Sequence, residues 1–246
     1  EKVTVYTTIF NINEAQENCV KEILEQSHQN FDWVVVYDCT NDRDVFQHLS
    51  GGDSRIKYVH NAIPGRWNAL VIALKNCDTD LIFNQDFDDI PSLDRLELQI
   101  NALNTNKNLA AVAGWYLASY KDYGVIEEHF DDLDTEGVKK ILPFWLPFAH
   151  SFCGFRKSAL EDVGGYPLGY LLEDGIIWSR LIGSGYDVAI IQKLIGTHFI
   201  HKNTTFGKVK GQVKKEVAFA ANRLEMRRNL KLHWYYDIFI IGRVFY

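Results

Sequence analysis

Residues 80–89 read Asp80-Leu81-Ile82-Phe83-Asn84-Gln85-Asp86-Phe87-Asp88-Asp89. A short apolar run is followed there by three carboxylates within four positions. An apolar run of this kind is typical of a buried strand, which would deliver the carboxylates to the edge of a sheet. Because carboxylates so close together repel one another, the stretch predicts a cation site rather than a solvated acidic turn.

The residues before this stretch indicate the kind of sheet to which it belongs. Strand-like apolar runs alternate there with segments of helical periodicity, which predicts a parallel sheet with helices packed on it. The expected strands are 3–10, 33–37, 56–59 and 81–83, and the expected helices are one capped by Asn13 and one over 67–75. The predicted fold class is α/β, with a Rossmann-like, mostly parallel central sheet flanked by helices.

The second half of the chain has a less regular pattern. A helix should begin near Leu93, strands are expected over 110–116 and 187–191, and a further helix is expected over 173–182. Residues 127–136 carry six acidic side chains and little apolar content, so we expect a surface loop there.

The C-terminal residues 206–246 form a predicted helical extension. They contain a basic helix, expected over 208–231, which is followed by the aromatic and apolar run 233–241. A segment of this composition can lie on an anionic membrane, bind a second copy of the chain or pack back on its own domain. The sequence leaves these three alternatives open.

The composition limits which partners and which cellular compartment are expected for the protein. The 246 residues carry a formal net charge of −6, which argues against nucleic acid as the main partner. The four cysteines form no C-x-x-C pair, so free thiols in a reducing compartment are expected. No secretory signal is evident, and the longest apolar run, 141–149, is broken by prolines and shorter than the roughly 20 residues that span a bilayer. We expect a cytoplasmic protein, at most peripheral on the inner face of a membrane.

Polar residues follow three of the predicted strands. Thr8 and Asn11 lie at the end of the first, Asp38 follows the second, and the acidic stretch follows the fourth. In an open parallel sheet, ligands bind outside the carboxyl ends of the strands. A nucleotide fits there, because Asp38 can accept a hydrogen bond from a base and clustered carboxylates can hold Mg²⁺ or Mn²⁺ on a diphosphate.

Several segments, in this order along the chain, resemble family 2 glycosyltransferases of the GT-A fold. The resemblance covers residues 3–203 and rests on Thr7-Thr8-Ile9-Phe10-Asn11, 23–31, Val34-Val35-Val36-Tyr37-Asp38, Asp86-Phe87-Asp88-Asp89-Ile90, Asp94-Arg95-Leu96-Glu97, 155–166 and Glu173-Asp174. Asp86 to Asp88 resembles the metal-binding D-x-D motif of the family. A lone D-x-D would be a weak signal, whereas several motifs in the family's order are specific.

The resemblance implies how a nucleotide-sugar donor is held. Thr8 and Asp38 would contact uracil, with Asn11 beside them, and Arg66 would approach the nucleotide. Asp86 would lie by the ribose or the metal. The sequence departs from the family pattern at Tyr37, where an Asp is usual, and in Gly65-Arg66-Trp67-Asn68, where the arginine is displaced by one position.

The resemblance also implies the metal site and the base. Asp88 would be the main ligand of Mn²⁺ or Mg²⁺, with Asp86, and His201 would make a third contact with metal or phosphate, unless the histidines at 198 and 201 are only structural. Asp174 would deprotonate the acceptor hydroxyl, with Glu173 as a competitor for that role. Family members invert the anomeric centre in one displacement.

The resemblance implies an inverting, metal-dependent glycosyltransferase (EC 2.4) of polysaccharide, lipopolysaccharide or glycan biosynthesis. The expected donor is a UDP-sugar and the expected acceptor a glycan or a lipid-linked glycan. Residues 1–115 would bind the donor and 116–205 the acceptor. A silent glycan-binding module and a sugar-phosphate nucleotidyltransferase are the alternatives.

For Trp145, Phe148 and Trp178, core packing is the default expectation and stacking on a sugar the alternative.

Overall fold

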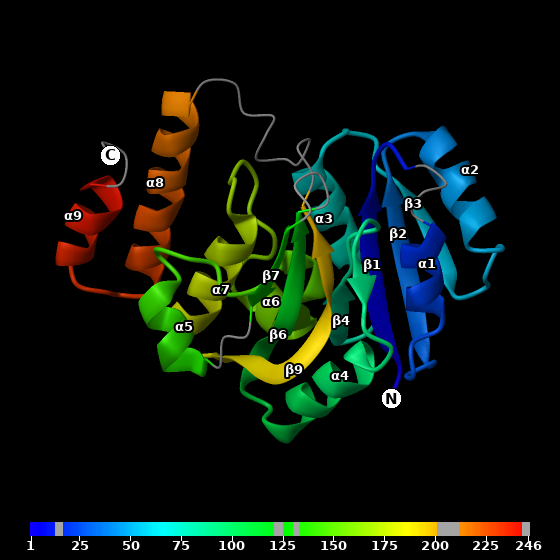
Figure 1. Ribbon diagram of the computed structural model, residues 1–246, viewed down its shortest axis with the longest axis horizontal. Coiled ribbons are helices and arrows are strands. Elements are labelled where there is room, and N and C mark those ends of the chain that lie inside the picture. The colour runs from blue at the N-terminus through cyan, green and yellow to red at the C-terminus, as the bar shows by residue number, and fades with distance from the viewer. Residues whose placement is uncertain (13–16, 121–124, 130–132, 201–211, 243–246) are drawn as a thin grey trace.

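A nine-stranded mixed sheet with helices on both faces organises the molecule (Figure 1). The structure is a computed structural model that describes residues 1–12, 17–120, 125–129, 133–200 and 212–242. Across the sheet the strand order is β3-β2-β1-β4-β8-β6-β9-β5, and β7 pairs with β6 beside this path.

The described elements have the following bounds. The strands are β1 (Val3–Ile9), β2 (Phe31–Tyr37), β3 (Ile56–His60), β4 (Leu81–Asn84), β5 (Ile90–Pro91), β6 (Leu109–Tyr120), β7 (Val125–His129), β8 (Gly154–Arg156) and β9 (Asp187–Phe199). The helices are α1 (Glu17–Leu24), α2 (Thr40–Leu49), α3 (Arg66–Asn76), α4 (Arg95–Thr105), α5 (Thr135–Ile141), α6 (Lys157–Asp162), α7 (Glu173–Gly183), α8 (Gln212–Asn229) and α9 (Tyr235–Gly242), with a 3₁₀ turn at His150–Phe152.

The first four strands are parallel, as the alternation of strands and helices predicts. β1 pairs with β2 and β4, and β2 pairs with β3, all in the parallel sense. β2 reads as a nearly continuous apolar run because both of its faces are covered, and Asp32 is its one residue that is not buried. The carboxyl ends of these strands therefore lie along one edge of the sheet.

Two hydrophobic clusters lie on opposite faces of this sheet. On one face, Leu70 of α3 packs with Tyr6 and Val34. On the other face, the helices α1, α2 and α4 contribute Ile23, Phe46 and Leu96, respectively, to a second cluster. The sheet is thus enclosed by helices on both faces, which confirms the α/β fold class.

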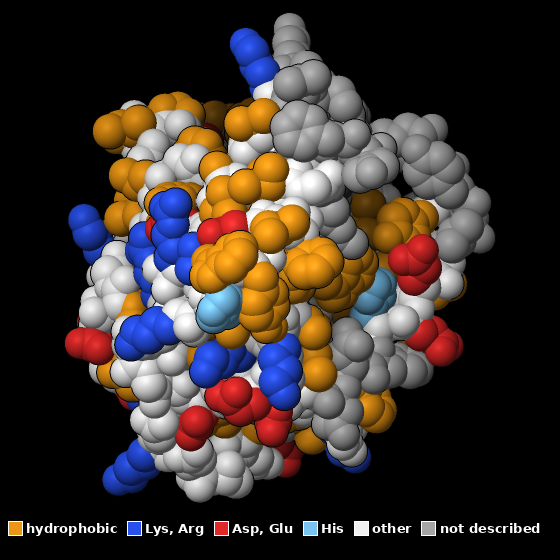
Figure 2. All heavy atoms as spheres, turned by 90° about the vertical axis from the view of Figure 1, so that its left-hand side faces the viewer, with side chains coloured by type: hydrophobic (Ala, Val, Ile, Leu, Met, Phe, Trp, Pro, Cys, Tyr) orange, Lys and Arg blue, Asp and Glu red, His pale blue; other side chains and the backbone are white. Residues whose placement is uncertain are grey.

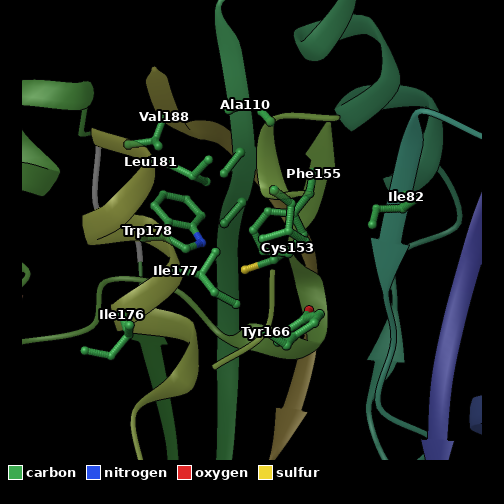
Figure 3. Packing of buried hydrophobic residues seen from close by; sticks show 14 of the residues in the cluster. Ile82, Ala110, Cys153, Phe155, Tyr166, Ile176, Ile177, Trp178, Leu181 and Val188 are labelled. Atoms are coloured by element: carbon green, nitrogen blue, oxygen red, sulfur yellow. The ribbon is translucent and has the colours of Figure 1, made fainter. Parts of the chain in front are cut away.

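Helix α7 packs against the middle of the sheet. Figure 3 shows its side chains Ile177 and Trp178 beside Cys153, and all three are fully buried. The Trp178 ring also stacks on Phe148, with ring centroids 4.0 Å apart. Core packing is therefore confirmed for Phe148 and Trp178, whereas Trp145 is 53% exposed.

Two segments differ from the sequence expectation. Within 127–136, β7 ends at His129 and α5 begins at Thr135, so the expected surface loop is wrong for those parts, while 130–132 lie outside the described residues. Charged residues are tolerated on β7 because it lies at an edge and pairs only with β6 in the described sheet. Helix α2 was not expected, because it buries only Asp42 and Phe46 and has no apolar stripe.

Helix α8 packs back on the domain, which was one of the three alternatives for the tail. Met226 is fully buried in the cluster that holds α7. The Asn222 side-chain oxygen accepts the backbone N–H groups of Leu171 and Leu172, each at 2.9 Å. Among the described helices, none combines the length and the apolar character needed to cross a bilayer.

Candidate functional site

The predicted donor-side residues follow the parallel strands at one edge of the sheet. Thr8 lies near the end of β1, where it is opposite Val36 of β2, and Asp38 follows the last residue of β2. Side chains alternate along a strand, so Thr8 shares a face with Tyr6, the face on which α3 and α7 pack. The exposed Asn11 follows β1 in a left-handed conformation with φ of 57°.

Asp38 is held in one orientation by two donors. Its Oδ1 accepts Asn61 Nδ2 at 2.7 Å, and its Oδ2 accepts the backbone N–H of Gly65 at 2.9 Å. Gly65 has φ of 130°, a conformation that residues with a Cβ rarely adopt, and it precedes the first residue of α3. Each carboxylate oxygen retains acceptor capacity, so Asp38 can still receive a hydrogen bond from a nucleobase.

A buried carboxylate that sequence reasoning missed fixes the loop after β1. Asp42 of α2 accepts the backbone N–H groups of Asn11 at 3.2 Å and Ile12 at 3.1 Å. The loop that carries Asn11 is therefore fastened to the neighbouring helix. Sequence reasoning could not find Asp42, because it is the third residue of a helix that has no apolar periodicity.

The three carboxylates of the acidic stretch have different surroundings. Asp89 is fully buried and accepts His198 Nδ1 at 2.8 Å and the Phe199 backbone N–H at 2.7 Å. Burial lowers the pKa of His198, but the charge of Asp89 outweighs it and raises this pKa to about 8. Asp89 thus links the acidic loop, residues 85–89, to the end of β9, and both of its carboxylate oxygens accept hydrogen bonds there.

Asp86 and Asp88 remain as candidate metal ligands. Burial, followed by the charges of Asp89 and Asp86, raises the pKa of the Asp88 carboxyl to about 7. Burial would also raise the pKa of Asp86, but the positive charge of Arg66 lowers it below its ordinary value. A neighbouring divalent ion would relieve the repulsion that acts on Asp88.

These two carboxylates fit a hard divalent ion. Mg²⁺ in particular is commonly bound through one or two carboxylates, with water and phosphate oxygens in the other positions. Within the part of the chain that the structure describes, no group of three His, Cys, Asp or Glu side chains is assembled for a metal. His201, the predicted third contact, lies outside the described residues.

Arg66 connects the acidic loop to the start of α7. Its Nε donates to Glu173 Oε1 at 2.9 Å, and its Nη2 lies 3.6 Å from Asp86 Oδ2. Burial opposes the charge on Arg66, yet the carboxylates of Asp86 and Glu173 raise the pKa of the guanidinium above its ordinary value. One cation therefore links two carboxylates that come from opposite halves of the sequence.

A buried histidine that sequence reasoning missed supports Arg66. His150 Nδ1 lies 3.0 Å from Arg66 Nη2, and its Nε2 lies 3.0 Å from the Tyr166 hydroxyl, which in turn hydrogen-bonds the Tyr6 hydroxyl. Burial and then the charge of Arg66 lower the pKa of His150 to about 4, so the imidazole is neutral at pH 7. Since the guanidinium only donates, Nδ1 accepts and Nε2 carries the proton.

The neighbours Glu173 and Asp174 are not equivalent. Glu173 is buried and engaged by Arg66, whereas Asp174 is partly accessible and its Oδ1 accepts the Gly175 backbone N–H at 2.8 Å. Burial, followed by the charge of Glu173, raises the pKa of Asp174 to about 7. A carboxylate with a pKa near 7 is suited to accept a proton at neutral pH.

The sequence model of the family described as "Glycosyl transferase family 2" matches residues 4–164, well over half of the chain. An Escherichia coli protein, "O-antigen biosynthesis glycosyltransferase WbnJ", is 24% identical over 185 residues, which cover 74% of this chain and 72% of that protein. Another E. coli protein, "UDP-Gal:alpha-D-GlcNAc-diphosphoundecaprenol beta-1,3-galactosyltransferase", is 26% identical over 181 residues, which cover 72% of this chain and 64% of that one. The chain thus spans roughly two thirds of the length of these relatives.

Solved structures share the fold. The mannosyltransferase PcManGT from Pyrobaculum calidifontis, in complex with GDP-Man and Mn²⁺, aligns with a TM-score of 0.68 at 15% identity over 94% of this chain and 69% of that one. TarS from S. aureus, in complex with UDP-GlcNAc, aligns with a TM-score of 0.67 at 15% identity over 98% of this chain and 71% of that one. The match to the family model shows that the chain belongs to glycosyl transferase family 2 and is a glycosyltransferase.

Proposed function

We propose that the protein transfers a sugar from a nucleoside diphosphate sugar, with a UDP-sugar as the expected donor, to a hydroxyl of a glycan or lipid-linked glycan, with inversion. The single observation that carries this proposal is the pair of Arg66 contacts, with Asp86 on the donor side and Glu173 beside Asp174. One guanidinium thus contacts a candidate metal ligand, Asp86, and the direct sequence neighbour of the candidate base. The polysaccharide and O-antigen context follows from the relatives' names.

On the donor side, Asp38 and Thr8 bind the base, Asn11 lies beside them, and Arg66 faces the diphosphate. Asp86 and Asp88 would hold Mn²⁺ or Mg²⁺, with His201 proposed as a third contact. The ion, when bound, stabilises the negative charge that grows on the departing diphosphate. Asp38 is already oriented by Asn61 and Gly65, so little of its rotational freedom is lost on binding.

On the acceptor side, Asp174 accepts the proton of the attacking hydroxyl. The acceptor oxygen forms a bond to the anomeric carbon while the bond from that carbon to the diphosphate oxygen breaks on the opposite face. The proton remains on Asp174, and the nucleoside diphosphate leaves. Glu173 is held by Arg66 and raises the pKa of Asp174, so it acts as a positioning residue rather than the base.

Two variants test these roles through turnover of a nucleotide-sugar panel with Mn²⁺. We expect Asp174→Asn to lower kcat by about 10² to 10⁴-fold while nucleotide affinity is kept, because only proton transfer is lost. Asp88→Ala should lower kcat/KM more than roughly a hundredfold, since even the outer-shell partners of metal ligands are worth about 10 to 100-fold. Asp94→Ala is the matched control, because Asp94 is exposed and its side chain makes no cap hydrogen bond.

Stability measurements show whether a loss of rate reflects misfolding. The folded pKa of Asp174 is raised, so its contribution to stability is lost as pH rises through about 7. Asp174→Asn should accordingly unfold at a temperature no lower than wild type at pH 8. Unchanged rates in both Asp174→Asn and Asp88→Ala would contradict the site assignment.

We also propose that α9 contacts a membrane that carries the acceptor. Its side chains Ile238, Phe239 and Ile241 are exposed by 59%, 64% and 44%. Figure 2 looks onto the side of the molecule with α8 and α9, where hydrophobic side chains gather among Lys and Arg side chains. The exposed Arg228 and Lys231 precede α9, and basic residues beside apolar ones favour an anionic lipid surface.

A further inference from the structure

We propose that Trp145 is a stacking platform for a pyranose ring of the acceptor. This inference rests on the proposed transfer function and adds to it a binding subsite outside the residues already assigned. Its basis is an aromatic stack formed by Tyr116, His129 and Trp145, whose inner ring meets His198 and whose outer ring is half exposed.

The three rings lie nearly parallel to their neighbours in the stack. Tyr116 of β6 and His129 of β7 are direct cross-strand partners, and their rings stack at 4.5 Å with an interplanar angle of 2°. His129 and Trp145 stack at 6.1 Å and 11°. The His129 imidazole therefore lies between two rings, and its Nε2, which makes no hydrogen bond within the described part of the chain, lies 3.7 Å from Glu127 Oε2.

Trp145 is held rigidly although its ring is half exposed. Its backbone N–H donates to Ile141 O at 2.9 Å, which fixes it at the end of α5. The preceding side chain, Phe144, stacks on Tyr236 of α9 at 5.5 Å. A ring with 53% exposure and a fixed backbone differs from the fully buried Trp178, whose packing needs no ligand. Such a preformed surface loses little entropy when it binds.

The stack has contacts toward both catalytic elements. At its inner end, Tyr116 meets His198 edge-on at 6.3 Å, and His198 is the residue that binds Asp89 of the acidic loop. At its outer end, the residue after Trp145 is Leu146, and a Cβ placed at Gly175 would lie only 2.8 Å from Leu146 Cδ2. Gly175 follows Asp174, so Trp145 and the proposed base are each one residue away from this contact.

A pyranose ring matches this surface chemically. The face of an indole is electron-rich, and the axial C–H groups of a sugar present a weakly positive, apolar patch to it. The hydroxyl groups around the sugar ring stay in water or meet polar side chains. The acceptor, unlike the donor nucleotide, must reach Asp174, and Leu146, the residue after Trp145, packs against Gly175, the residue after Asp174.

The test measures binding of the methyl glycosides of glucose, galactose, mannose and N-acetylglucosamine to the full chain by saturation-transfer NMR. Samples contain Mg²⁺ and either UDP or GDP, so that a donor-side occupant is present. We expect binding to wild type and Trp145→Phe, and a dissociation constant about tenfold higher for Trp145→Ala, which corresponds to the loss of one ring contact. Trp145→Leu should show a dissociation constant as high as that of Trp145→Ala, because leucine lacks the aromatic face. This variant keeps an apolar contact with His129, so it tests the aromatic ring and not apolar character alone.

Trp234→Ala is the matched control, because Trp234 is 62% exposed and lies outside the stack; it should bind like wild type. Equal binding by wild type and Trp145→Ala would overturn the proposal, and so would the absence of glycoside binding to wild type in every sample. Calorimetric binding of nucleotide sugars with Mn²⁺ separates this inference from the transfer function. It should be the same in Trp145→Ala and wild type, and its absence from wild type with every donor would count against transfer while the NMR result still decides on Trp145.

Discussion

At the scale of single residues, Arg66 has the greatest influence on the site. It donates to Glu173, faces His150 and lies near Asp86. Its positive charge lowers the pKa of Asp174, although burial and Glu173 outweigh it and leave that pKa raised to about 7. The pH dependence of transfer should therefore report on Arg66.

We expect kcat/KM to rise with pH through about 7, because Asp174 must be deprotonated to accept a proton. Arg66→Gln should move this rise to higher pH, since a charge that favours the carboxylate is removed. Arg66→Lys should move it less, because the charge is kept. The measurement is the pH profile of kcat/KM at saturating metal.

Arg66→Gln also leaves the buried Glu173 without its partner, so it should destabilise the fold by about 3 kcal/mol. Glu161→Gln is a control for the pH profile, because Glu161 is an exposed carboxylate on α6. An unmoved pH limb in a folded Arg66→Gln enzyme would show that Asp174 is not the group that titrates.

At the scale of elements, the turn into α3 positions the donor side. Gly65 combines φ of 130° with an N–H that donates to Asp38. We expect Gly65→Ala to weaken UDP binding about tenfold, because the strained backbone moves the N–H that orients Asp38. Calorimetry of UDP binding measures the effect.

Gly52→Ala provides a matched control, because Gly52 also has a positive φ, 69°, and also has open space around a Cβ. Gly52→Ala should lose on the order of 1 kcal/mol of stability, and Gly65→Ala should lose more, because φ of 130° with ψ of 147° is a conformation essentially restricted to glycine. Only Gly65→Ala should lose nucleotide affinity, and an equal loss in both variants would remove Asp38 from the donor site.

The sequence predicted the elements that carry a strong apolar period and missed those that do not. The parallel strands and the helices α3 and α7 are apolar over their buried faces, so their patterns are distinct. The helix α2 and the three-residue strand β8 bury too few apolar side chains to give a pattern. Their positions depend on neighbours that the fold brings together.

In the candidate site, too, the residues within local motifs could be predicted and those held by distant contacts could not. Asp86, Asp88 and Asp174 lie in recognisable local motifs, so the sequence alone indicates them as candidates, and their roles stay predictions. His150 contacts Arg66 across 84 positions of sequence, and no local pattern encodes such a contact. Its one sequence signal is that a histidine and a serine interrupt the apolar run between Ile141 and Phe155.

At the scale of the whole molecule, the C-terminal helices divide into a packed part and an exposed part. α8 and the residue that follows it contribute the buried Met226 and Leu230 to the main core, and Gly183 of α7 has no room for a Cβ against the backbone of Asn229. α9 leaves Ile238 and Phe239 in solvent. The fold therefore depends on α8, whereas the exposed face of α9 is free to act outside the domain.

We expect the full chain to float with vesicles of phosphatidylethanolamine and phosphatidylglycerol. The triple variant Ile238→Ser, Phe239→Ser, Ile241→Ser should float much less, because the apolar contact is lost while the basic residues remain. Its thermal stability and its transfer to water-soluble glycosides should stay at the wild-type level.

A second triple variant, Ile63→Ser, Leu93→Ser, Ile126→Ser, serves as the control, since these side chains are exposed by 69%, 56% and 64% outside α9. It should float like wild type. If the two triple variants float equally well, α9 is not the membrane contact.

The stacking of Phe144 on Tyr236 joins α9 to the loop that carries Trp145. The C-terminal helix is consequently not a module that can be exchanged without effect. In a chimera that receives α9 from another member of the family, the position of the loop that carries Trp145 would change along with the membrane contact. A substitution in α9 is therefore expected to alter acceptor preference and membrane attachment at the same time.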